Sequence, residues 1–383
     1  MTVTTRLKAV ATLMVTLGFW MSGLSRGVAG VDPSKTANVV PARSIKFEYP
    51  EALAVGHEGD LLVAARRQHQ VFRLNKWGEI SLVAGDGRRG LSGDGGLAVG
   101  ASLDNPGGVA VDAAGNVIIA DTYNNRIRRV DARTGIIRTV AGGGNEDPWK
   151  DNHPAIAASL ALPTALAVDP EGNLLFTDSG HFRVRKVDMP SGLIQAVAGR
   201  GTNRYTGDGS PATSADLENP GALALDSGGN LFIVEAGDDR VRRVDARTRL
   251  ISTFAGTGAQ GFSGDGGPAL NARLYGPRGV AVDREGNVFI ADASNRRIRR
   301  IDAGTGFICT VAGTGVLGLG GNGGPAASAG LFEPLYVVVD PAGNLYFIEP
   351  YGRCIRRVDA VTKTISVVFG PRPSVCEPAP PQP

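Results

Sequence analysis

Short apolar runs separated by turn residues recur along this chain. Residues 106–142, PGGVAVDAAGNVIIADTYNNRIRRVDARTGIIRTVAG, contain four of them, at 108–112, 116–121, 126–131 and 136–142. The runs are rich in β-branched residues, and Gly-Asn, a polar loop and Thr-Gly separate them, as is typical of strands joined by turns. The stretch therefore predicts a four-stranded antiparallel meander, which cannot bury both of its faces alone.

The same pattern returns six times. A proline precedes each first run: Pro50, Pro106, Pro163, Pro220, Pro277 and Pro334. An aspartate follows it at intervals of 57 residues, with Gly56 at this place in the first copy: Asp112, Asp169, Asp226, Asp283 and Asp340. A glycine closes each copy: Gly85, Gly142, Gly199, Gly256, Gly313 and Gly370. A repeat of this length is typical of a stacked or radial architecture.

Two features of the runs indicate how the copies pack. The second run is continuously apolar, as in 173–178 (NLLFTD), which implies burial on both faces. The first run has alanine at its centre in five copies, which suits a crowded strand near an axis. We therefore predict an all-β fold, a six-bladed β-propeller of four-stranded antiparallel blades, at 50–85, 106–142, 163–199, 220–256, 277–313 and 334–370.

The first 29 residues differ from the rest. Arg6 and Lys8 precede an apolar run at 9–24, and small residues end at Ala29. This pattern predicts a secretory signal peptide cleaved after Ala29, and hence a secreted or periplasmic protein. An uncleaved N-terminal anchor is the alternative, although the run is short for a spanning helix. No later segment is apolar for long enough to span a membrane.

Removing this segment changes the charge. The whole chain carries 40 basic and 37 acidic residues. Arg6, Lys8 and Arg26 lie in the segment, which has no acid, so 37 of each remain. The balance offers no support for nucleic-acid binding, which needs a positive field or face.

The repeat resembles a known one. The pattern P-x-G-V-A-V-D-x-x-G-N-V-x-I-A-D-x-x-N-x-R-I-R-R-x-D, present at 106–131 and 277–302, is similar to the NHL repeat. The connector at 261–269 (GFSGDGGPA) resembles those of exported bacterial NHL-repeat proteins and of the teneurin NHL region. The resemblance implies a six-bladed propeller. It leaves function open, because NHL propellers include protein-, glycan- and RNA-binding modules, sensor domains and an amidating lyase.

Residues that recur in every copy are expected to serve the architecture. The second run ends in an acid in five copies, and an arginine follows seven residues later. The acids are Asp121, Asp178, Glu235, Asp292 and Glu349; the arginines are Arg128, Arg185, Arg242, Arg299 and Arg356. We expect the acids to cap the adjoining loop or to pair with the arginines between blades. A carboxylate ring that holds a metal is the alternative.

The connectors share a second position: Asp94, Asp151, Asp208, Asp265 and, in the last, Asn322. An Asp turn followed by one helical turn explains it. Calcium is the alternative, but one carboxylate per loop falls short of the six to eight oxygens that calcium takes.

The loops between the second and third runs differ most between copies, and antiparallel strands place them on one face with the long connectors. We expect this loop face to be the functional one. Residues after the six prolines should ring the channel mouth there: Glu51, Gly107, Thr164, Gly221, Arg278 and Leu335. The candidate binding residues are Glu51, Arg66, Arg67, His69, Tyr123, Asn124, His181, Asp238, Asp239, Arg278, Asn295, Arg296 and Tyr351. Their mixture of charge, amides and tyrosines suits a protein or polysaccharide partner.

Histidines are the candidate zinc ligands on this face. His69, His153 and His181 could share it, and zinc can bind three histidines with one open position. The three have no repeated spacing, so we expect neither zinc nor calcium as a cofactor.

The remaining features lie near the ends. Cys354 begins the third run of the last copy, so a Cys354–Cys376 disulfide would tie the Pro-rich tail, 371–383, to that blade, leaving Cys309 free. Three reduced thiols are the alternative. Residues 38–40 or 45–47, in the N-terminal segment 30–49, could add a strand where the first and last blades meet.

Two functions remain. The first is a non-catalytic extracytoplasmic binding or scaffold module that uses the loop face. The second is a metal-dependent lyase or hydrolase of the six-bladed-propeller type.

Overall fold

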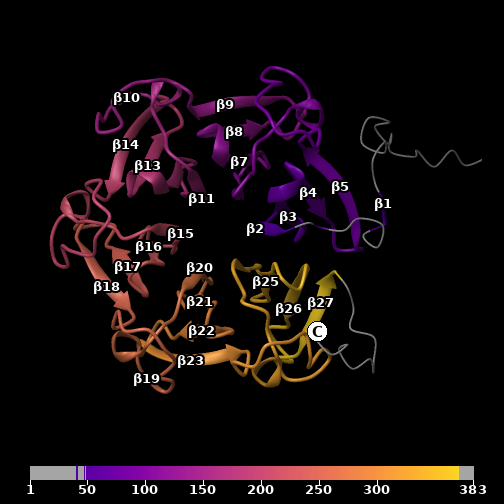
Figure 1. Ribbon diagram of the computed structural model, residues 1–383, viewed down its shortest axis with the longest axis vertical. Coiled ribbons are helices and arrows are strands. Elements are labelled where there is room, and N and C mark those ends of the chain that lie inside the picture. The colour runs from indigo at the N-terminus through magenta and orange to yellow at the C-terminus, as the bar shows by residue number, and fades with distance from the viewer. Residues whose placement is uncertain (1–39, 42–46, 48, 371–383) are drawn as a thin grey trace, which may run out of the picture. The chain divides into compact units, whose positions relative to one another are not determined.

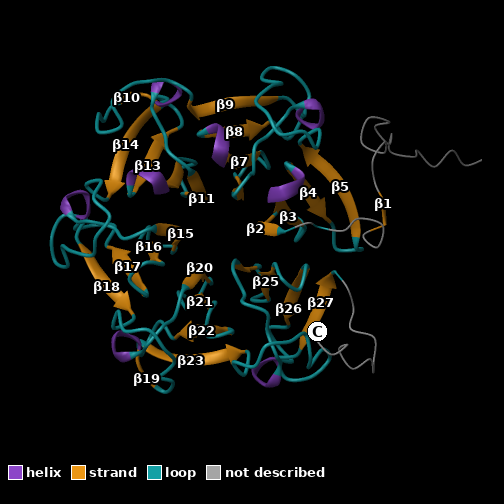
Figure 2. Cartoon of the chain, viewed as in Figure 1, coloured by secondary structure: helices purple, strands orange, loops and turns teal. Residues whose placement is uncertain are grey.

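The computed structural model describes residues 40–41, 47 and 49–370, all within one compact unit, 38–383. The predicted signal peptide and the tail at 371–383 lie outside these residues. Strands dominate the described part, which contains no α-helix and only single turns of 3-10 helix (Figure 2). Nowhere in it is there a helix of the length and apolarity that a membrane crossing requires.

Six antiparallel sheets surround a common centre, which confirms the predicted fold class (Figure 1). The first three blades contain β2 (Pro50–Val55), β3 (Leu61–Ala65), β4 (Gln70–Leu74) and β5 (Glu79–Ala84); β6 (Gly108–Val111), β7 (Val117–Asp121), β8 (Arg126–Val130) and β9 (Ile137–Gly142); and β11 (Pro163–Val168), β12 (Leu174–Asp178), β13 (Arg183–Asp188) and β14 (Leu193–Ala198). The last three contain β15 (Pro220–Leu225), β16 (Leu231–Glu235), β17 (Arg240–Val244) and β18 (Ile251–Ala255); β20 (Pro277–Val282), β21 (Val288–Asp292), β22 (Arg297–Ile301) and β23 (Phe307–Ala312); and β24 (Val337–Val339), β25 (Leu345–Glu349), β26 (Cys354–Val358) and β27 (Ile365–Phe369).

The first strand of each blade lies nearest the centre. Each contacts the first strand of the next blade in the order β2, β6, β11, β15, β20 and β24, and β24 contacts β2. The ring is therefore closed, and the small residues at the centre of these strands permit their close approach.

Every blade receives one more pairing, from the segment that leads into it. The two-residue strands β1 (Val40–Pro41), β10 (His153–Pro154) and β19 (Gly267–Pro268) pair with the outer strands β5, β14 and β23. Single bridges do the same in the other three blades: Leu97 to Ile136, Pro211 to Leu250 and Pro325 to Thr364. Residues 40–41 thus lie along the outer edge of blade one, as part of a connector lies along each other blade.

The connectors also contain single 3-10 turns, where the sequence predicted one helical turn after the connector aspartate. These are η3 (Ala98–Gly100), η5 (Ala155–Ala157), η7 (Ala212–Ser214), η8 (Ala269–Asn271) and η9 (Ala326–Ser328). Three shorter loops, between second and third strands, contain η2 (Arg66–Gln68), η4 (Thr122–Asn124) and η6 (Ser179–His181).

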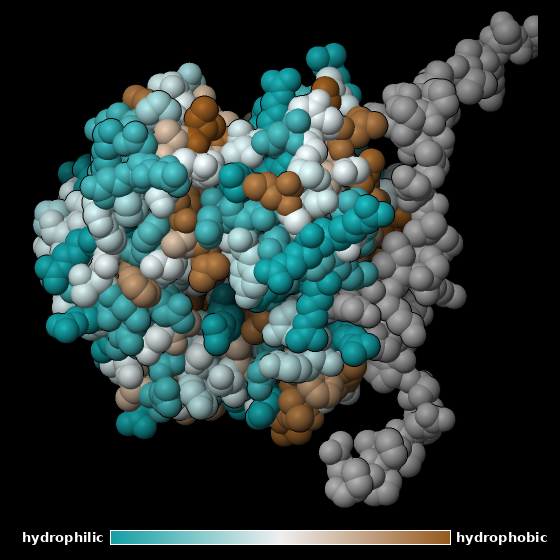
Figure 3. All heavy atoms as spheres, turned by 45° about the horizontal axis from the view of Figure 1, so that its top comes forward, coloured by the Kyte–Doolittle hydropathy of each residue, from teal (hydrophilic) through white to brown (hydrophobic). Residues whose placement is uncertain are grey.

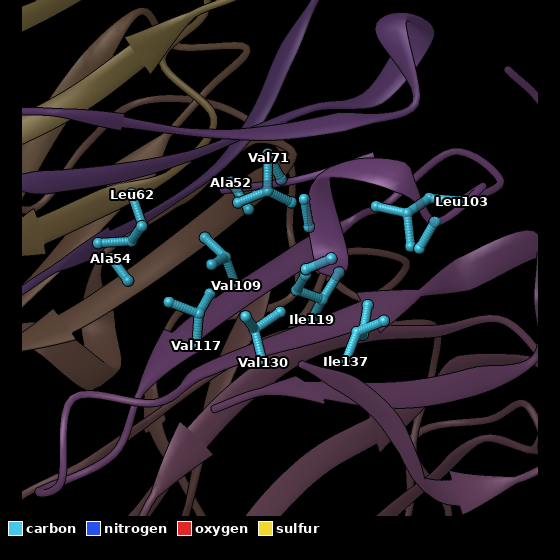
Figure 4. Packing of buried hydrophobic residues seen from close by; sticks show 14 residues of the cluster. Ala52, Ala54, Leu62, Val71, Leu103, Val109, Val117, Ile119, Val130 and Ile137 are labelled. Atoms are coloured by element: carbon cyan, nitrogen blue, oxygen red, sulfur yellow. The ribbon is translucent and has the colours of Figure 1, made fainter. Parts of the chain in front are cut away.

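The core consists of apolar clusters between neighbouring blades. Between blades one and two, Ala52, Leu62, Val109 and Ile119 pack with Leu103 from the connector (Figure 4). Leu103 has counterparts at the same repeat position in the other connectors, all at most 5% exposed: Leu160, Leu217, Leu274 and Leu331. Each connector therefore places a leucine between two blades.

Phe47 takes this place at the junction of blades six and one. It lies 56 residues before Leu103 and is 1% exposed. Its ring centroid is 4.2 Å from that of Phe369 in blade six and 5.4 Å from that of Phe72 in blade one. The larger aromatic side chain thus packs where the last blade meets the first.

The opposite face, which carries the first-to-second and third-to-fourth strand turns, is uniform in blades two to six. We call it the turn face. Asp112 Oδ1 accepts hydrogen bonds from Ala114 N and Asn116 N, and Asn116 Oδ1 accepts one from Ala132 N in the next turn. The same Asp–Asn pairing occurs at Asp169–Asn173, Asp226–Asn230, Asp283–Asn287 and Asp340–Asn344. These repeated residues therefore hold both turns of a blade together.

A glycine closes each blade because the backbone there has a positive φ and passes close to another backbone segment. Gly256 has φ +93, and a Cβ there would lie 2.4 Å from the carbonyl oxygen of Asp239. Only glycine fits without displacing the loop of its own blade.

A buried arginine lies in the third strand of blades two to six. The five residues, Arg128, Arg185, Arg242, Arg299 and Arg356, are 0% exposed. Each pairs with the acid that ends the second strand of its own blade, at N···O distances of 3.2 to 3.7 Å. The expectation that these pairs would join different blades was therefore wrong, because the two side chains lie on adjacent strands.

The second partner of each arginine is the connector that leads into the blade. Arg128, Arg185, Arg242 and Arg299 lie 2.6 to 3.9 Å from Asp94, Asp151, Asp208 and Asp265. Arg356 donates to Asn322 Oδ1 over 3.1 Å. The shared connector position thus binds a guanidinium.

Blade one differs at both positions of the pair. Ala65 stands where the other blades have the acid, and Phe72 stands where they have the arginine. Both are buried, and Phe72 faces Phe47. An apolar contact therefore replaces the ion pair where no earlier blade precedes.

We predict that Arg299→Met lowers the free energy of unfolding by about 3–5 kcal/mol, because it leaves the buried Asp292 without a counter-charge. Asp292→Ala/Arg299→Phe reproduces the residues of blade one and should cost less than the single change. Chemical denaturation measures both. The control is Arg300→Met, on the partly exposed neighbour that pairs with Asp302. A loss below 1 kcal/mol for Arg299→Met, or a larger loss for the double variant, would contradict this prediction.

Candidate functional site

The loop face contains the second-to-third strand loops and the connectors, as predicted. Several predicted binding residues there serve the scaffold. Asn124 Nδ2 donates to Asp121 Oδ2 and to Gly90 O, and Asn295 Nδ2 donates to Asp292 Oδ2 and to Gly261 O, over 2.7 to 2.9 Å. At the same repeat position, His181 Nδ1 lies 3.0 Å from Asp178 Oδ2. These side chains hold a buried acid and are not free for a ligand.

The residue that follows in each loop has a left-handed backbone, and in blades one, two, four and five its side chain binds the next connector. His69 Nδ1 accepts from Asn105 N over 3.1 Å, and Asp239 Oδ1 accepts from Gly276 N over 2.6 Å. Their φ values are 54° and 51°. His69 and Asp239 therefore fix the path of the chain between blades.

Two further candidates are engaged with nearby loop groups. Asp238 accepts a hydrogen bond from Arg240, which also donates to Thr257 O. Arg296 Nη1 donates to Gly315 O over 3.3 Å. Their positions in blades four and five also separate them from the cluster described next.

The remaining candidates other than Arg278, which lies in blade five, gather at the junction of blades six, one and two. We call Tyr49, Glu51, Arg66, Arg67, Tyr123 and Tyr351 the Tyr–Arg cluster. Arg66 Nη1 donates to Glu51 Oε1 over 3.0 Å, and Arg66 Nη2 donates to Tyr123 Oη over 3.1 Å. Arg66 thus joins the channel-facing strand of blade one to the loop of blade two.

The other half of the cluster joins blade one to blade six. Arg67 Cζ lies 4.9 Å from the centroid of the Tyr49 ring, a cation–π distance. The Tyr49 ring meets that of Tyr351 edge to face, with centroids 6.3 Å apart. Tyr123 and Tyr351 are 45% and 64% exposed, so rings at both ends of the cluster face solvent.

Glu51 has an unusual environment within this cluster. Its Oε2 atom is buried and has no hydrogen-bond partner among the residues that the structure describes. Burial raises the pKa of Glu51, while the charges of Arg66 and Arg278 oppose the rise. Arg278, in the first strand of blade five, therefore lies within electrostatic reach of the same mouth.

Tyr336 forms part of the surroundings of Glu51. It packs against the apolar clusters on both sides of blade one, and burial followed by the charge of Glu51 raises the pKa of its hydroxyl. Tyr336 occupies a position filled by alanine or glycine in the other five blades: Ala52, Gly108, Ala165, Ala222 and Gly279. A large aromatic side chain therefore packs near Glu51, where the other blades have a small residue.

Sequence reasoning missed Tyr49 and Tyr336, although the repeat carried a signal for both. Tyr336 breaks a run of small residues. Tyr49 precedes a strand-initiating proline, where the other copies have Asn105, Leu162, Asn219, Gly276 and Glu333.

The histidines do not form a metal site. His153 lies in β10 at the outer edge of blade three and is 4% exposed, while His69 and His181 bind groups of their own loops. Across the described ranges, no three His, Cys, Asp or Glu side chains lie close enough together to hold a metal ion. The interpretation that His69, His153 and His181 share one face is therefore wrong for His153.

Two of the three cysteines lie in the described part of the chain. Cys309 is exposed on the outer strand β23. Cys354 is buried, and its Sγ donates to Glu349 Oε2 over 3.3 Å. Cys376, and with it the predicted Cys354–Cys376 disulfide, lies outside the described residues.

The face of the molecule seen in Figure 3 is mainly polar, with apolar residues scattered among hydrophilic ones. On the turn face, a hollow of about 380 Å³ lies where the turns of blades five, six and one meet, and Arg284 and His57 line it.

Comparisons with known proteins agree with this architecture. A family model described as the teneurin NHL domain matches residues 257–320, and one described as the NHL repeat matches residues 103–130. Teneurin-m of Drosophila melanogaster is 30% identical over 70% of this chain and 11% of its own length. NHL repeat-containing protein 2 of Bos taurus is 26% identical over 83% of this chain and 47% of its own length.

Solved structures show the same fold at low identity. Virginiamycin B lyase from Staphylococcus aureus has a TM-score of 0.52 at 15% identity, covering 88% of both chains. An auxiliary nutrient binding protein from Bacteroides ovatus has a TM-score of 0.60 at 14% identity, covering 86% of this chain and 72% of the other. At these identities the likeness concerns the fold alone.

The closed ring of six repeated sheets defines a six-bladed β-propeller. The repeat that builds it is the NHL repeat, so the resemblance predicted from the sequence is confirmed and the chain is an NHL-repeat β-propeller. The chain spans less than half the length of the curated relatives described above.

We predict that stability falls as the pH rises from 5 to 7.5. Burial raises the pKa of Glu235 and Glu349 to about 7 and that of Asp292 to about 6. The folded protein therefore holds protons that the unfolded chain releases near pH 4 to 4.5, so this contribution is lost as the pH passes through 6 to 7. The melting temperature should fall by several degrees over this range.

A variant separates this effect from general charge repulsion. Glu235→Gln/Glu349→Gln should flatten the dependence of the melting temperature on pH, and Glu285→Gln, on an exposed turn residue, should leave it as in the wild type. Equal slopes in all three proteins would contradict the prediction.

Proposed function

We propose that this propeller is a non-catalytic extracytoplasmic recognition module whose loop face binds a protein or a polar polymer. The observation that carries the proposal is the Tyr–Arg cluster. It lies where the blades differ in sequence, and its aromatic and guanidinium groups are the types enriched at binding surfaces.

The uniformity of the other positions supports this choice of face. The Asp–Asn turns and the buried arginines recur in nearly every blade and have partners within the fold. Arg67, Tyr123 and Tyr351 share one repeat position, which holds Gly180, Gly237 and Ser294 in the other blades, and all three are exposed. A repeated scaffold that varies at one exposed position is the arrangement expected of a binding module.

A metal-dependent lyase or hydrolase is the alternative. Similar folds include a lyase, but that likeness concerns the fold alone. His69 and His181 lie in blades one and three and His153 at an outer edge, so a catalytic site built from them would need a rearrangement of loops. Binding by the existing cluster needs none.

Surface plasmon resonance tests the proposal with a panel of extracellular proteins and of acidic and neutral polysaccharides. We expect at least one class to bind the wild type and Arg67→Ala/Tyr351→Ala to bind it at least tenfold more weakly. Arg284→Ala, on the turn face, is the control and should bind within twofold of the wild type.

Two results would overturn the proposal. One is binding that the turn-face control loses and the loop-face variant keeps. The other is stoichiometric zinc or calcium in the purified protein that disappears when His69, His153 and His181 are replaced, together with turnover of a substrate.

A further inference from the structure

The channel mouth contains an acceptor with no donor. Glu51 Oε1 is bound by Arg66, whereas Glu51 Oε2 is buried without a partner among the described residues. A buried acceptor left in this state is costly, and the cost disappears when a donor is supplied. The Glu51 side chain as a whole is 22% exposed, so a ligand donor such as a hydroxyl group can approach its carboxylate from the mouth.

The charges around Glu51 restrict what that ligand can be. Arg66 and Arg278 act on the Glu51 carboxylate from blades one and five, and Arg67 lies over the neighbouring Tyr49 ring. Two guanidinium groups around one carboxylate disfavour a cationic ligand such as a lysine side chain. They favour a ligand that carries a negative charge in addition to its donor.

The guanidinium groups are not equally available. Arg66 is held by Glu51 and Tyr123, and Arg67 lies over Tyr49. Arg278 is exposed and takes part in no recorded hydrogen bond or ion pair within the described part of the chain. It can therefore bind a ligand carboxylate in bidentate fashion without breaking an internal contact.

The exposed rings supply the third element. Tyr123 and Tyr351 lie on opposite sides of blade one, and both present a ring to solvent. Flat apolar rings with a polar edge suit the C–H face of a pyranose, whose hydroxyl groups point outward to polar side chains. An acidic peptide would match the arginines, but it carries few hydroxyl groups for Glu51.

We propose that the mouth binds a uronic-acid unit of an acidic polysaccharide. A ring hydroxyl donates to the Glu51 carboxylate, the ring carboxylate accepts from Arg278, and Tyr123 or Tyr351 covers one face of the sugar. This inference rests on the proposed function, because it names the ligand class of the same loop face.

Isothermal titration calorimetry with tetragalacturonate, and with galactotetraose as its neutral counterpart, tests the assignment. The wild type should bind the acidic probe at least tenfold more tightly than the neutral one. Arg278→Ala should weaken the acidic probe by about tenfold or more, the loss expected for a charge-assisted hydrogen bond, and leave the neutral probe unchanged. Glu51→Gln should weaken both probes by a similar factor.

Arg284→Ala is the matched control, since it removes the same charge from an exposed site in the same blade at the opposite end of the channel. It should leave both affinities within twofold. Circular dichroism of Glu51→Gln and Arg278→Ala should match the wild type, so that altered affinity reports the site.

Four results would overturn the inference: no binding of tetragalacturonate at millimolar concentration, equal affinity for the two sugars, equal losses in Arg278→Ala and Arg284→Ala, or tighter binding of an oligoglutamate peptide. If a protein in the binding panel still depends on Arg67 and Tyr351, the proposed function stands and only the ligand class falls.

Discussion

A guanidinium group buried between a blade and its connector is the interaction on which the rest of this structure depends. Removing an arginine from water costs several kcal/mol, so each needs partners within the fold. Each of the five finds one carboxylate on the neighbouring strand, and four find a second on the connector, with Asn322 taking that role for Arg356. Because the connector partner is thereby fixed, the chain enters every blade along the same path, and its leucine lies between the same two sheets. Blade one follows no earlier blade and packs directly against the last one. Ala65, Phe72 and Phe47 form an apolar contact there in place of the ion pair.

The fixed scaffold explains why the two ends of the channel differ. On the turn face, the Asp–Asn pairs leave little room for change, because Asn116 and its counterparts each support two turns at once. On the loop face, the acid and arginine are buried beneath the loops, so the residues above them can vary without loss of the fold. The Tyr–Arg cluster lies at the junction where the repeat is least regular. The candidate binding site therefore lies where blade one departs from the repeat.

Much of the fold could be predicted from the sequence, because a period of 57 residues and alternating strand and turn signals constrain the topology strongly. The site was harder. Asn124, Asn295 and His181 looked free because the sequence does not show that their loop folds back over the buried acid. Arg66, Tyr123 and Tyr351 were recognised as candidates, but their association across three blades depends on Tyr49. Phe47 could have been found by extending the register of Leu103 upstream by one repeat, since it fills the same place between sheets.

Amide hydrogen exchange of Arg242→Gln tests most directly whether the buried guanidinium holds the connector to its blade. The account predicts faster exchange confined to the connector at 199–219, which contains Asp208 and leads into blade four, with the connectors at 142–163 and 256–277 exchanging as in the wild type. Unchanged exchange at 199–219, or a uniform increase across all six blades, would contradict the account.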